Sequence, residues 1–440
     1  KVTLSHATFK LKDEEGNYIK QKVGLFYNDE WTTDEKGYVV LDNMIESGTY
    51  TIEELKTPEG FLIGNDIKVN ISSDNDEIYF DQDNQPVIEV SFVDEKPTGH
   101  LILHKEFERE EDTAVGGAQF KVTADSDIVN PATGKLIYKK GAPVIMGNST
   151  DGIYMIDESG KLELTGLPLG TTGAKYMVEE ISTVDGYVLL DEPVIFEFDI
   201  KDNTTKEYTV EKTIENKLTE TYFSKQDLNG TELKGGEYSV IDAENGEIIE
   251  QWTSDGNVHL IKGLVMGQNY IYREDLTPLG YTYAKDVKFT MSENKQTIVM
   301  KDTQVAINKL DESGNVVKGA ILQIVDDQKN VMDQWTTDGT VHYAQGLKVG
   351  ETYTIVEIKT PEGYKTAPSV TFTVDGEQDL SITMTDYRIL TDILVNKIDS
   401  KTHQNIMHND FEFTIYSDEK CQNPLKTVKA DTTKGTALFE

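Results

Sequence analysis

The sequence predicts an all-β fold, arranged as a linear tandem array of small β-sandwich domains. Short runs rich in Val, Ile, Thr and Tyr alternate with turn signals such as EEGN, DEKG, AENG and DESGN, and helical periodicity is almost absent. A twelve-residue phrase also recurs four times along the chain. Recurrence of this kind indicates separate structural units rather than one large domain. The 440 residues are 37% hydrophobic, so each unit can form a core.

The repeated phrase centres on one glutamate. Its copies read YTIEELKTPEGF, YMVEEISTVDGY, YIYREDLTPLGY and YTIVEIKTPEGY. Because alternate residues of a strand face the same side, the glutamate shares a face with the opening Tyr and with the apolar residue two positions later. We therefore expect it to point inward, where a carboxylate needs a partner or a chemical role. The four glutamates are Glu54, Glu180, Glu274 and Glu357.

Each unit is also expected to open on a strand that carries a lysine and to close on a strand that ends in Asp or Asn. The opening lysines are Lys105, Lys225, Lys309 and Lys397. The closing residues are Asp94, Asn216, Asp302 and Asp386. A second strand follows each lysine, with the sequences GGAQFKV, GGEYSVI, KGAILQI and HNDFEFT. These landmarks predict five domains, here called the first to fifth repeats, over residues 1–97, 98–218, 219–303, 304–389 and 390–440.

The first and fifth repeats are expected to be partial. The first lacks the lysine strand, so Glu54 and Asp94 should remain uncoupled in this chain. The fifth begins at the Lys397 strand but ends before any copy of the phrase. We therefore expect the chain to be a segment of a longer tandem array. The second repeat is longer than the others because of an insertion at residues 130–144.

The residue types of the three complete repeats suggest one reaction. Burial lowers the pKa of a lysine and raises that of a glutamic acid, because both charged forms lose hydration. The neutral amine is then a nucleophile, and the protonated carboxyl group can polarise a target carbonyl and pass a proton to the leaving group. The product is an amide, with loss of ammonia from Asn or water from Asp. A buried ion pair without a covalent bond is the alternative reading. The predicted bonds are Lys105–Asn216, Lys225–Asp302 and Lys309–Asp386, with Glu180, Glu274 and Glu357 as catalysts.

The phrase resembles the E-box of pilins, and the whole unit resembles the B-type repeat of collagen adhesins (CnaB, prealbumin-like fold). The fourth repeat fits best, with INKLD, GAILQI, WTTDG, GLKVG, YTIVEIKTPEGY and TMTD in order. The second lacks the Pro of the phrase but has the more usual terminal Asn. The resemblance implies Ig-like, prealbumin-like sandwiches from Gram-positive surface adhesins and sortase-assembled pili. It also implies self-generated Lys–Asn or Lys–Asp isopeptide bonds catalysed by an acidic residue.

Composition and motifs exclude several other classes of function. A formal net charge of −36 disfavours binding to nucleic acid or anionic membranes. Cys421 is the only cysteine, so no intrachain disulfide can form. No apolar run approaches the roughly 20 residues of a membrane helix. The histidines show no HExxH-type pattern, and the acidic turns lack the ligand spacing of a calcium loop. We expect no metal and no cofactor.

We expect a mechanical function: a stalk or pilus-shaft segment on the surface of a Gram-positive bacterium, attached to the cell wall through regions outside this chain. The only catalysis expected is the single-turnover cross-linking. The alternative is an adhesin region that binds host matrix protein or glycan, with the insertion of the second repeat as the first place to look. Trp31, Trp252 and Trp335 recur 22 or 23 residues before the glutamate, which favours a role in the fold over glycan binding. An enzyme would need a further domain, because the chain has no triad, metal motif or phosphate loop.

Overall fold

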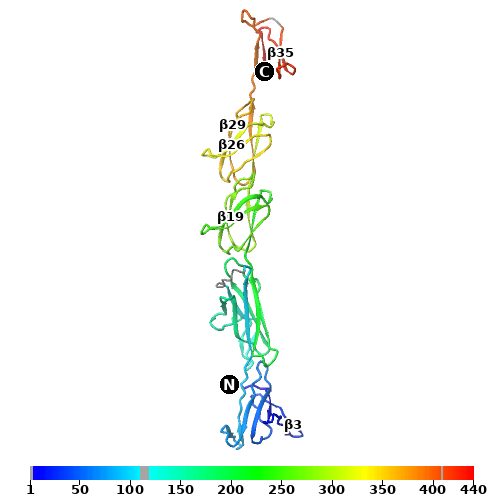
Figure 1. Cartoon of the computed structure of the whole chain (residues 1–440), viewed down its shortest axis with the longest axis vertical. Helices are drawn as coiled ribbons and strands as arrows, with labels where there is room; N and C mark the ends of the chain where they lie inside the picture. The colour runs from blue at the N-terminus through cyan, green and yellow to red at the C-terminus, as the bar shows by residue number, and fades with distance from the viewer. Residues whose placement is uncertain (1–2, 110–117, 408–409) are drawn as a thin grey trace. The chain divides into compact units, whose positions relative to one another are not determined.

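The computed structural model describes residues 3–109, 118–407 and 410–440 (Figure 1). These residues form β-strands and no α-helix, which confirms the all-β prediction. None of the described residues forms a helix suited to crossing a bilayer. Four residues of the expected second strands, Gly116, Gly117, His408 and Asn409, lie outside the described residues. The chain divides into two compact units, one of Lys1–Thr221, Leu260–Gln268 and Thr290–Gln296, the other of Tyr222–His259, Asn269–Phe289 and Thr297–Glu440.

In the first repeat, four strands form an antiparallel sheet in the order β4-β1-β5-β6, with the glutamate phrase on β5. One cluster of buried apolar side chains in this repeat consists of Leu11, Trp31 and Tyr50, with partly buried neighbours around them. The strands are β1 (Thr8–Lys12), β2 (Gln21–Val23), β3 (Phe26–Asn28), β4 (Trp31–Thr32), β5 (Gly48–Lys56), β6 (Ile67–Ile71), β7 (Ile78–Phe80) and β8 (Pro86–Ile88).

The second repeat is a sandwich of two sheets, ordered β13-β10-β15-β16 and β14-β9-β17. Its first and last long strands, β9 and β17, are parallel neighbours over their whole length. The strands are β9 (Thr98–Phe107), β10 (Gln119–Ala124), β11 (Ile128–Val129), β12 (Leu136–Tyr138), β13 (Ile153–Met155), β14 (Lys161–Pro168), β15 (Gly173–Ser182), β16 (Val194–Asp199) and β17 (Glu207–Asn216).

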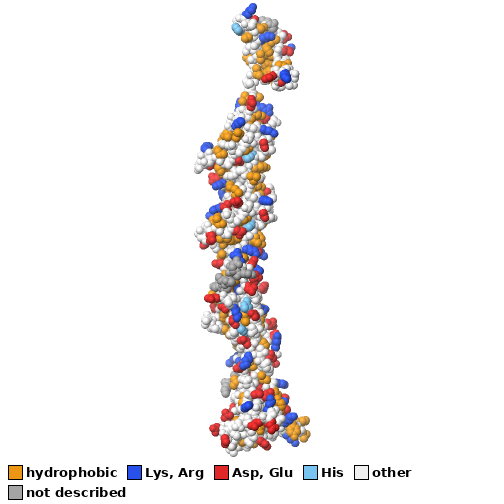
Figure 2. All heavy atoms as spheres, in the orientation of Figure 1, with side chains coloured by type: hydrophobic (Ala, Val, Ile, Leu, Met, Phe, Trp, Pro, Cys, Tyr) orange, Lys and Arg blue, Asp and Glu red, His pale blue; other side chains and the backbone are white. Residues whose placement is uncertain are grey.

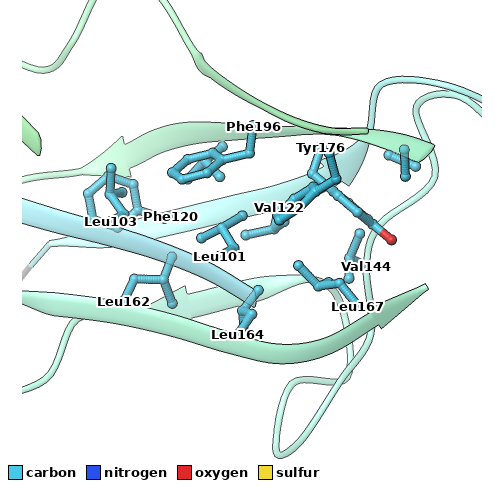
Figure 3. Close-up of a cluster of buried hydrophobic side chains, with 14 of the residues drawn as sticks. Leu101, Leu103, Phe120, Val122, Val144, Leu162, Leu164, Leu167, Tyr176 and Phe196 are labelled. Atoms are coloured by element: carbon cyan, nitrogen blue, oxygen red, sulfur yellow. The ribbon is translucent and has the colours of Figure 1, made fainter. Parts of the chain in front are cut away.

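The two sheets of the second repeat enclose its hydrophobic core (Figure 3). Leu101 and Leu103 of β9 contribute from one sheet, while Phe120 of β10 and Tyr176 of β15 contribute from the other. All four are at most 1% exposed. Apolar residues alternate with polar ones along β9 and β15, as a sandwich with one buried face per sheet requires.

In the third repeat, one sheet has the strand order β20-β19-β22-β23, with the glutamate phrase on β22. Aromatic side chains dominate its interior: Phe223 packs on Trp252, Tyr272 and Phe289 with ring centroids 5.1–5.7 Å apart. The strands are β18 (Glu220–Gln226), β19 (Lys234–Asp242), β20 (Ile248–Asp255), β21 (His259–Lys262), β22 (Asn269–Leu276), β23 (Val287–Thr290) and β24 (Gln296–Lys301).

The fourth repeat again has two sheets, β28-β25-β32-β30 and β27-β26-β29-β31, with the lysine strand β25 parallel to the closing strand β32. Described strands of the fifth repeat pair as β33-β36 and β34-β35. The strands are β25 (Val305–Asp311), β26 (Ile321–Val325), β27 (Val331–Thr336), β28 (His342–Tyr343), β29 (Thr352–Lys359), β30 (Tyr364–Lys365), β31 (Val370–Thr373), β32 (Leu380–Arg388), β33 (Ile393–Asn396), β34 (Glu412–Tyr416), β35 (Pro424–Lys429) and β36 (Thr436–Phe439).

Candidate functional site

Every phrase glutamate lies opposite an aromatic or leucine residue of a neighbouring antiparallel strand. In all four repeats that contain the phrase, the strand register shifts just before this opposite residue, which marks a β-bulge or irregularity. Bulges re-aim side chains and are common beside reactive sites. The glutamate side chains are buried as the sequence predicts, with Glu54 at 3% exposure and the other three side chains at 0%. The pairs are Phe9 with Glu54, Phe120 with Glu180, Tyr238 with Glu274, and Leu322 with Glu357.

One oxygen of each glutamate is held by the backbone. The amide N–H ten residues further along donates to Oε2 in all four repeats. The glycine of the phrase lies between, at a φ of +81° to +88°, a left-handed conformation that glycine adopts without steric cost. The turn therefore brings the chain back onto the carboxyl group and leaves Oε1 to face the lysine. The donors are Gly64 at 2.5 Å, Leu190 at 3.0 Å, Ala284 at 2.8 Å and Ala367 at 2.7 Å.

In the third repeat the predicted lysine, glutamate and aspartate meet in one buried site. Lys225 Nζ lies 3.0 Å from Glu274 Oε1 and also donates to Asp302 Oδ1. The side chains of Lys225, Glu274 and Asp302 are between 0% and 3% exposed. The second carboxylate oxygen of Asp302 is buried without a hydrogen-bond partner among the described residues.

The fourth repeat has the same arrangement, and its strand register explains why. Lys309 Nζ lies 3.2 Å from Glu357 Oε1 and donates to Asp386 Oδ1. On the parallel strands β25 and β32, Lys309 is opposite Met384, two residues before Asp386. A two-residue offset keeps both side chains on the same face of the sheet, so the long lysine side chain can reach the carboxyl group.

In the second repeat the glutamate lies between the lysine and the asparagine. Lys105 Nζ is 3.9 Å from Glu180 Oε1, donates to the backbone oxygen of Glu106 at 3.0 Å and lies 4.3 Å from the ring centroid of Phe107. Asn216 Nδ2 donates to both carboxylate oxygens of Glu180, at 2.9 and 2.8 Å. Asn216 Oδ1 is buried and has no hydrogen-bond partner in the described part of the chain. Thus Glu180 lies between the amine of Lys105 and the side-chain amide of Asn216.

Burial shifts the acid–base equilibria of Lys105, Asp302 and Asp386 toward their uncharged forms. It lowers the pKa of Lys105 to about 8, against the opposing attraction of Glu180. It also raises the pKa of Asp302 and that of Asp386, against the opposing effect of the lysine, and the neighbouring glutamate adds to the rise. A neutral amine beside a neutral carboxyl group is the reactive combination for condensation.

The partial repeats hold incomplete sets. Burial raises the pKa of Glu54 to about 7 and also raises that of Asp94. Glu54 Oε1 and Asp94 Oδ1 are buried and unpaired among the described residues. In the fifth repeat, Lys397 Nζ lies 4.9 Å from the ring centroid of Phe411.

Sequence reasoning missed two features of these sites. It did not identify the backbone donors, because an amide is not visible in a side-chain pattern. It also passed over a threonine three residues after each glutamate, although every copy of the phrase contains one: Thr57, Thr183, Thr277 and Thr360. In the described ranges, no group of three or more His, Cys, Asp or Glu is arranged to hold a metal ion.

The recurring tryptophans belong to the fold. Trp31 is 4% exposed. Trp252 and Trp335 are half-buried and stack on His259 and His342, with ring centroids 4.3 and 3.9 Å apart. These contacts lie within a repeat and support the structural role predicted for the three rings.

The family of the SpaA prealbumin-like fold domain matches this chain four times, over residues 1–86, 99–214, 219–304 and 303–388. Solved structures with a similar fold include the Bacillus anthracis TIE protein, at 18% identity over 88% of this chain and 69% of that one, with a TM-score of 0.32. The shaft pilin SpaA of Lactobacillus rhamnosus GG is 15% identical over 39% of this chain and 98% of its own, with a TM-score of 0.22. A streptococcal ancillary pilin is 15% identical over 67% and 100%, with a TM-score of 0.27. No curated protein matches the chain.

Proposed function

We propose that this chain, which belongs to the family of SpaA prealbumin-like fold domains, is a load-bearing stalk or pilus-shaft segment stabilised by self-generated isopeptide bonds. We place it at the surface of a Gram-positive cell, because the family is named after SpaA and the SpaA of Lactobacillus rhamnosus GG is a shaft pilin. The observation that carries the proposal is the recurrence of one buried lysine, glutamate and Asp or Asn set in three successive repeats. A merely structural ion pair needs only two of these groups.

The second repeat supports a complete proton path for the reaction. The neutral Nζ of Lys105 attacks Cγ of Asn216, a C–N bond forms, and the amine proton passes to Glu180. Glu180 then donates that proton to Nδ2, the Cγ–Nδ2 bond breaks, and ammonia leaves. The contacts of Glu180 with both nitrogens fit this relay. Glu180 therefore acts mainly as a proton shuttle, since within the described residues its carboxyl group contacts nitrogen atoms and not the carbonyl oxygen that the sequence analysis expected it to polarise.

In the third and fourth repeats the leaving group is water. Lys225 and Lys309 each contact one oxygen of the carboxyl group that would acylate their Nζ. Proton transfer within the buried pair gives a neutral amine and a neutral acid. Attack on Cγ of Asp302 or Asp386 then forms the amide and expels the protonated hydroxyl as water, with Glu274 or Glu357 moving the proton.

The position of the bonds suits a mechanical role. In the second and fourth repeats the lysine strand and the closing strand are parallel neighbours, β9 with β17 and β25 with β32. Tension along the chain enters a repeat at the first of these strands and leaves at the last. A covalent bridge between them carries the load past the rest of the sandwich, so the repeat cannot be extended by pulling.

Single-molecule force extension tests this function. The second, third and fourth repeats should show no increase in length from unfolding. The first repeat, which lacks the opening lysine strand, should unfold and serve as the internal reference. A triple variant, Glu180→Gln, Glu274→Gln and Glu357→Gln, should add three lengthening events. Full extension of the wild-type chain would contradict the proposal.

A second candidate function, ligand binding, rests on an exposed apolar hairpin in the first repeat rather than on the insertion of the second. Leu25, Phe26 and Tyr27 at the β2–β3 hairpin are 92%, 78% and 70% exposed. Figure 2 shows hydrophobic side chains gathered over the segment labelled β3 in Figure 1. Exposed apolar clusters often mark contact surfaces. Binding to immobilised host matrix protein or glycan that disappears in a Phe26→Ser variant would support this function, and unchanged binding would exclude the hairpin.

A further inference from the structure

We propose that the threonine three residues after the phrase glutamate is a positioning residue for the cross-link, and that Thr183 sets the orientation of the reacting amide of Asn216. This inference rests on the proposed cross-linking function and extends it to a residue outside the lysine, glutamate and Asp or Asn set. The relevant group is the side-chain hydroxyl.

In the second repeat the hydroxyl holds the leaving group directly. Thr183 Oγ1 accepts a hydrogen bond from Asn216 Nδ2 at 2.7 Å. The same nitrogen donates to Glu180 at 2.8 and 2.9 Å. Since the amide nitrogen has two protons, Thr183 and Glu180 together occupy both. This fixes rotation about the Cβ–Cγ bond, and it keeps Nδ2 beside the carboxyl group that must protonate it.

The equivalent hydroxyl lies at the same junction in two other repeats. Thr57 Oγ1 donates to Asp94 Oδ2 at 3.3 Å, so it contacts the closing residue, as Thr183 does. Thr360 Oγ1 donates to Glu357 Oε2 at 3.0 Å, so it contacts the catalyst instead. A threonine needed only to end a strand would have no reason to reach the closing residue or the phrase glutamate in three repeats.

Among the described residues of the third repeat, the equivalent threonine hydroxyl contacts the backbone and neither the glutamate nor the closing residue. Thr277 Oγ1 donates to the backbone oxygen of Thr282 at 3.2 Å. Thr282 in turn is hydrogen-bonded to Thr303, the residue after Asp302. Here the hydroxyl supports the backbone beside the closing residue rather than its side chain. The effect of removing the hydroxyl should therefore be largest in the second repeat.

Two substitutions of Thr183 separate the hydroxyl from the shape of the side chain. Thr183→Val keeps the branched shape and removes the hydroxyl, whereas Thr183→Ser keeps the hydroxyl. Thr213→Val is the matched control, because Thr213 is an exposed threonine on the same strand as Asn216. The full chain is made by cell-free synthesis and quenched at intervals in acidic denaturant. Peptide mass mapping then follows the linkage of the Lys105 and Asn216 peptides.

We expect Thr183→Val to form the Lys105–Asn216 bond about five to ten times more slowly, which is the effect of losing one buried hydrogen bond from the transition state. Thr183→Ser and Thr213→Val should form it at the wild-type rate. The Lys225–Asp302 bond should form at an unchanged rate in all variants.

Three results would overturn the inference, and they can be told apart. Equal rates for Thr183→Val and wild type would refute the role of Thr183 while leaving the cross-link intact. A Thr183→Ser variant as slow as Thr183→Val would assign the effect to packing and not to the hydroxyl. A wild-type chain that never loses ammonia would refute the proposed function itself, and the inference with it.

Discussion

Lys309 Nζ lies 3.2 Å from Oε1 of Glu357 while the backbone N–H of Ala367 holds Oε2 of the same carboxyl group at 2.7 Å. The glutamate is thus fixed by the main chain and is not simply the counterion of the lysine. Fixed placement of a proton-transfer group before reaction lowers the cost of reaching the transition state. This relationship leads to the predictions that follow.

Intact mass should reveal the cross-links. One ammonia and two waters are expelled if all three bonds form, so the chain should weigh about 53 Da less than its sequence mass. The first repeat should contribute nothing, because it has no lysine partner for Glu54 and Asp94. A chain at its full sequence mass would rule out the reaction in all three repeats.

Removing one catalytic carboxyl group should affect one repeat only. Glu357→Ala should retain about 18 Da relative to a chain with three bonds, after correction for the substitution, since water is no longer lost from Asp386. Peptide mapping should then show Lys309 free and Lys225 still linked. Linkage of Lys309 in this variant would show that Glu357 is dispensable.

Loss of the bond should destabilise the third repeat. Glu274→Gln keeps the size of the side chain but removes the carboxyl group, and the 77-residue separation of Lys225 and Asp302 is no longer closed. The chain-entropy model then gives a loss of about 4.5 kcal/mol in the free energy of unfolding. Denaturation followed by Trp252 fluorescence, in a background with Trp31→Phe and Trp335→Phe, measures it. The exposed neighbour Asp275 supplies the control, Asp275→Asn, which should unfold as the wild type does.

The rate of bond formation in the second repeat should depend on pH. Only the neutral amine attacks, and the pKa of Lys105 is lowered to about 8. The rate should therefore rise from pH 6 and level off above about pH 8, whereas an unperturbed lysine would keep it rising to about pH 10. Timed quenching of newly synthesised chain in buffers across this range gives the profile.

The first repeat should lose stability as pH increases. The pKa of Glu54 is raised to about 7 in the folded state, so the folded chain binds this proton more tightly than the unfolded chain does. Stability is then fully present below the ordinary glutamate pKa and is lost as pH rises through about 7, by an amount of order 2 kcal/mol. The raised pKa of Asp94 acts in the same direction.

Urea denaturation followed by Trp31 fluorescence, with Trp252→Phe and Trp335→Phe, would measure this effect. Glu54→Gln should flatten the dependence between pH 5 and pH 8. A wild-type midpoint that does not change over this range would contradict the assignment.

Much of the fold and of the site could be predicted from residue patterns. The period-two alternation identified strands, and it placed Glu54, Glu180 and Glu274 on the same face as buried tyrosines. The contact of Lys309 with Asp386 could also be predicted from the sequence, because it requires only that the first and last strands of the repeat be neighbours. The hydrogen bond from the backbone N–H of Leu190 or Ala367 to the glutamate Oε2 could not be predicted, since it depends on how a turn folds back onto the strand.

The sequence by itself determined the all-β class and the recurrence of the unit, and it supplied the side chains that we propose to react, because these follow from local periodicity and residue chemistry. Only the tertiary structure decided which atoms face each other. It put Glu180 between Lys105 and Asn216, and it brought the hydroxyl of Thr183 to the leaving nitrogen. Such contacts join strands far apart in the chain, so they are set by sheet register and burial and have no local pattern that reveals them.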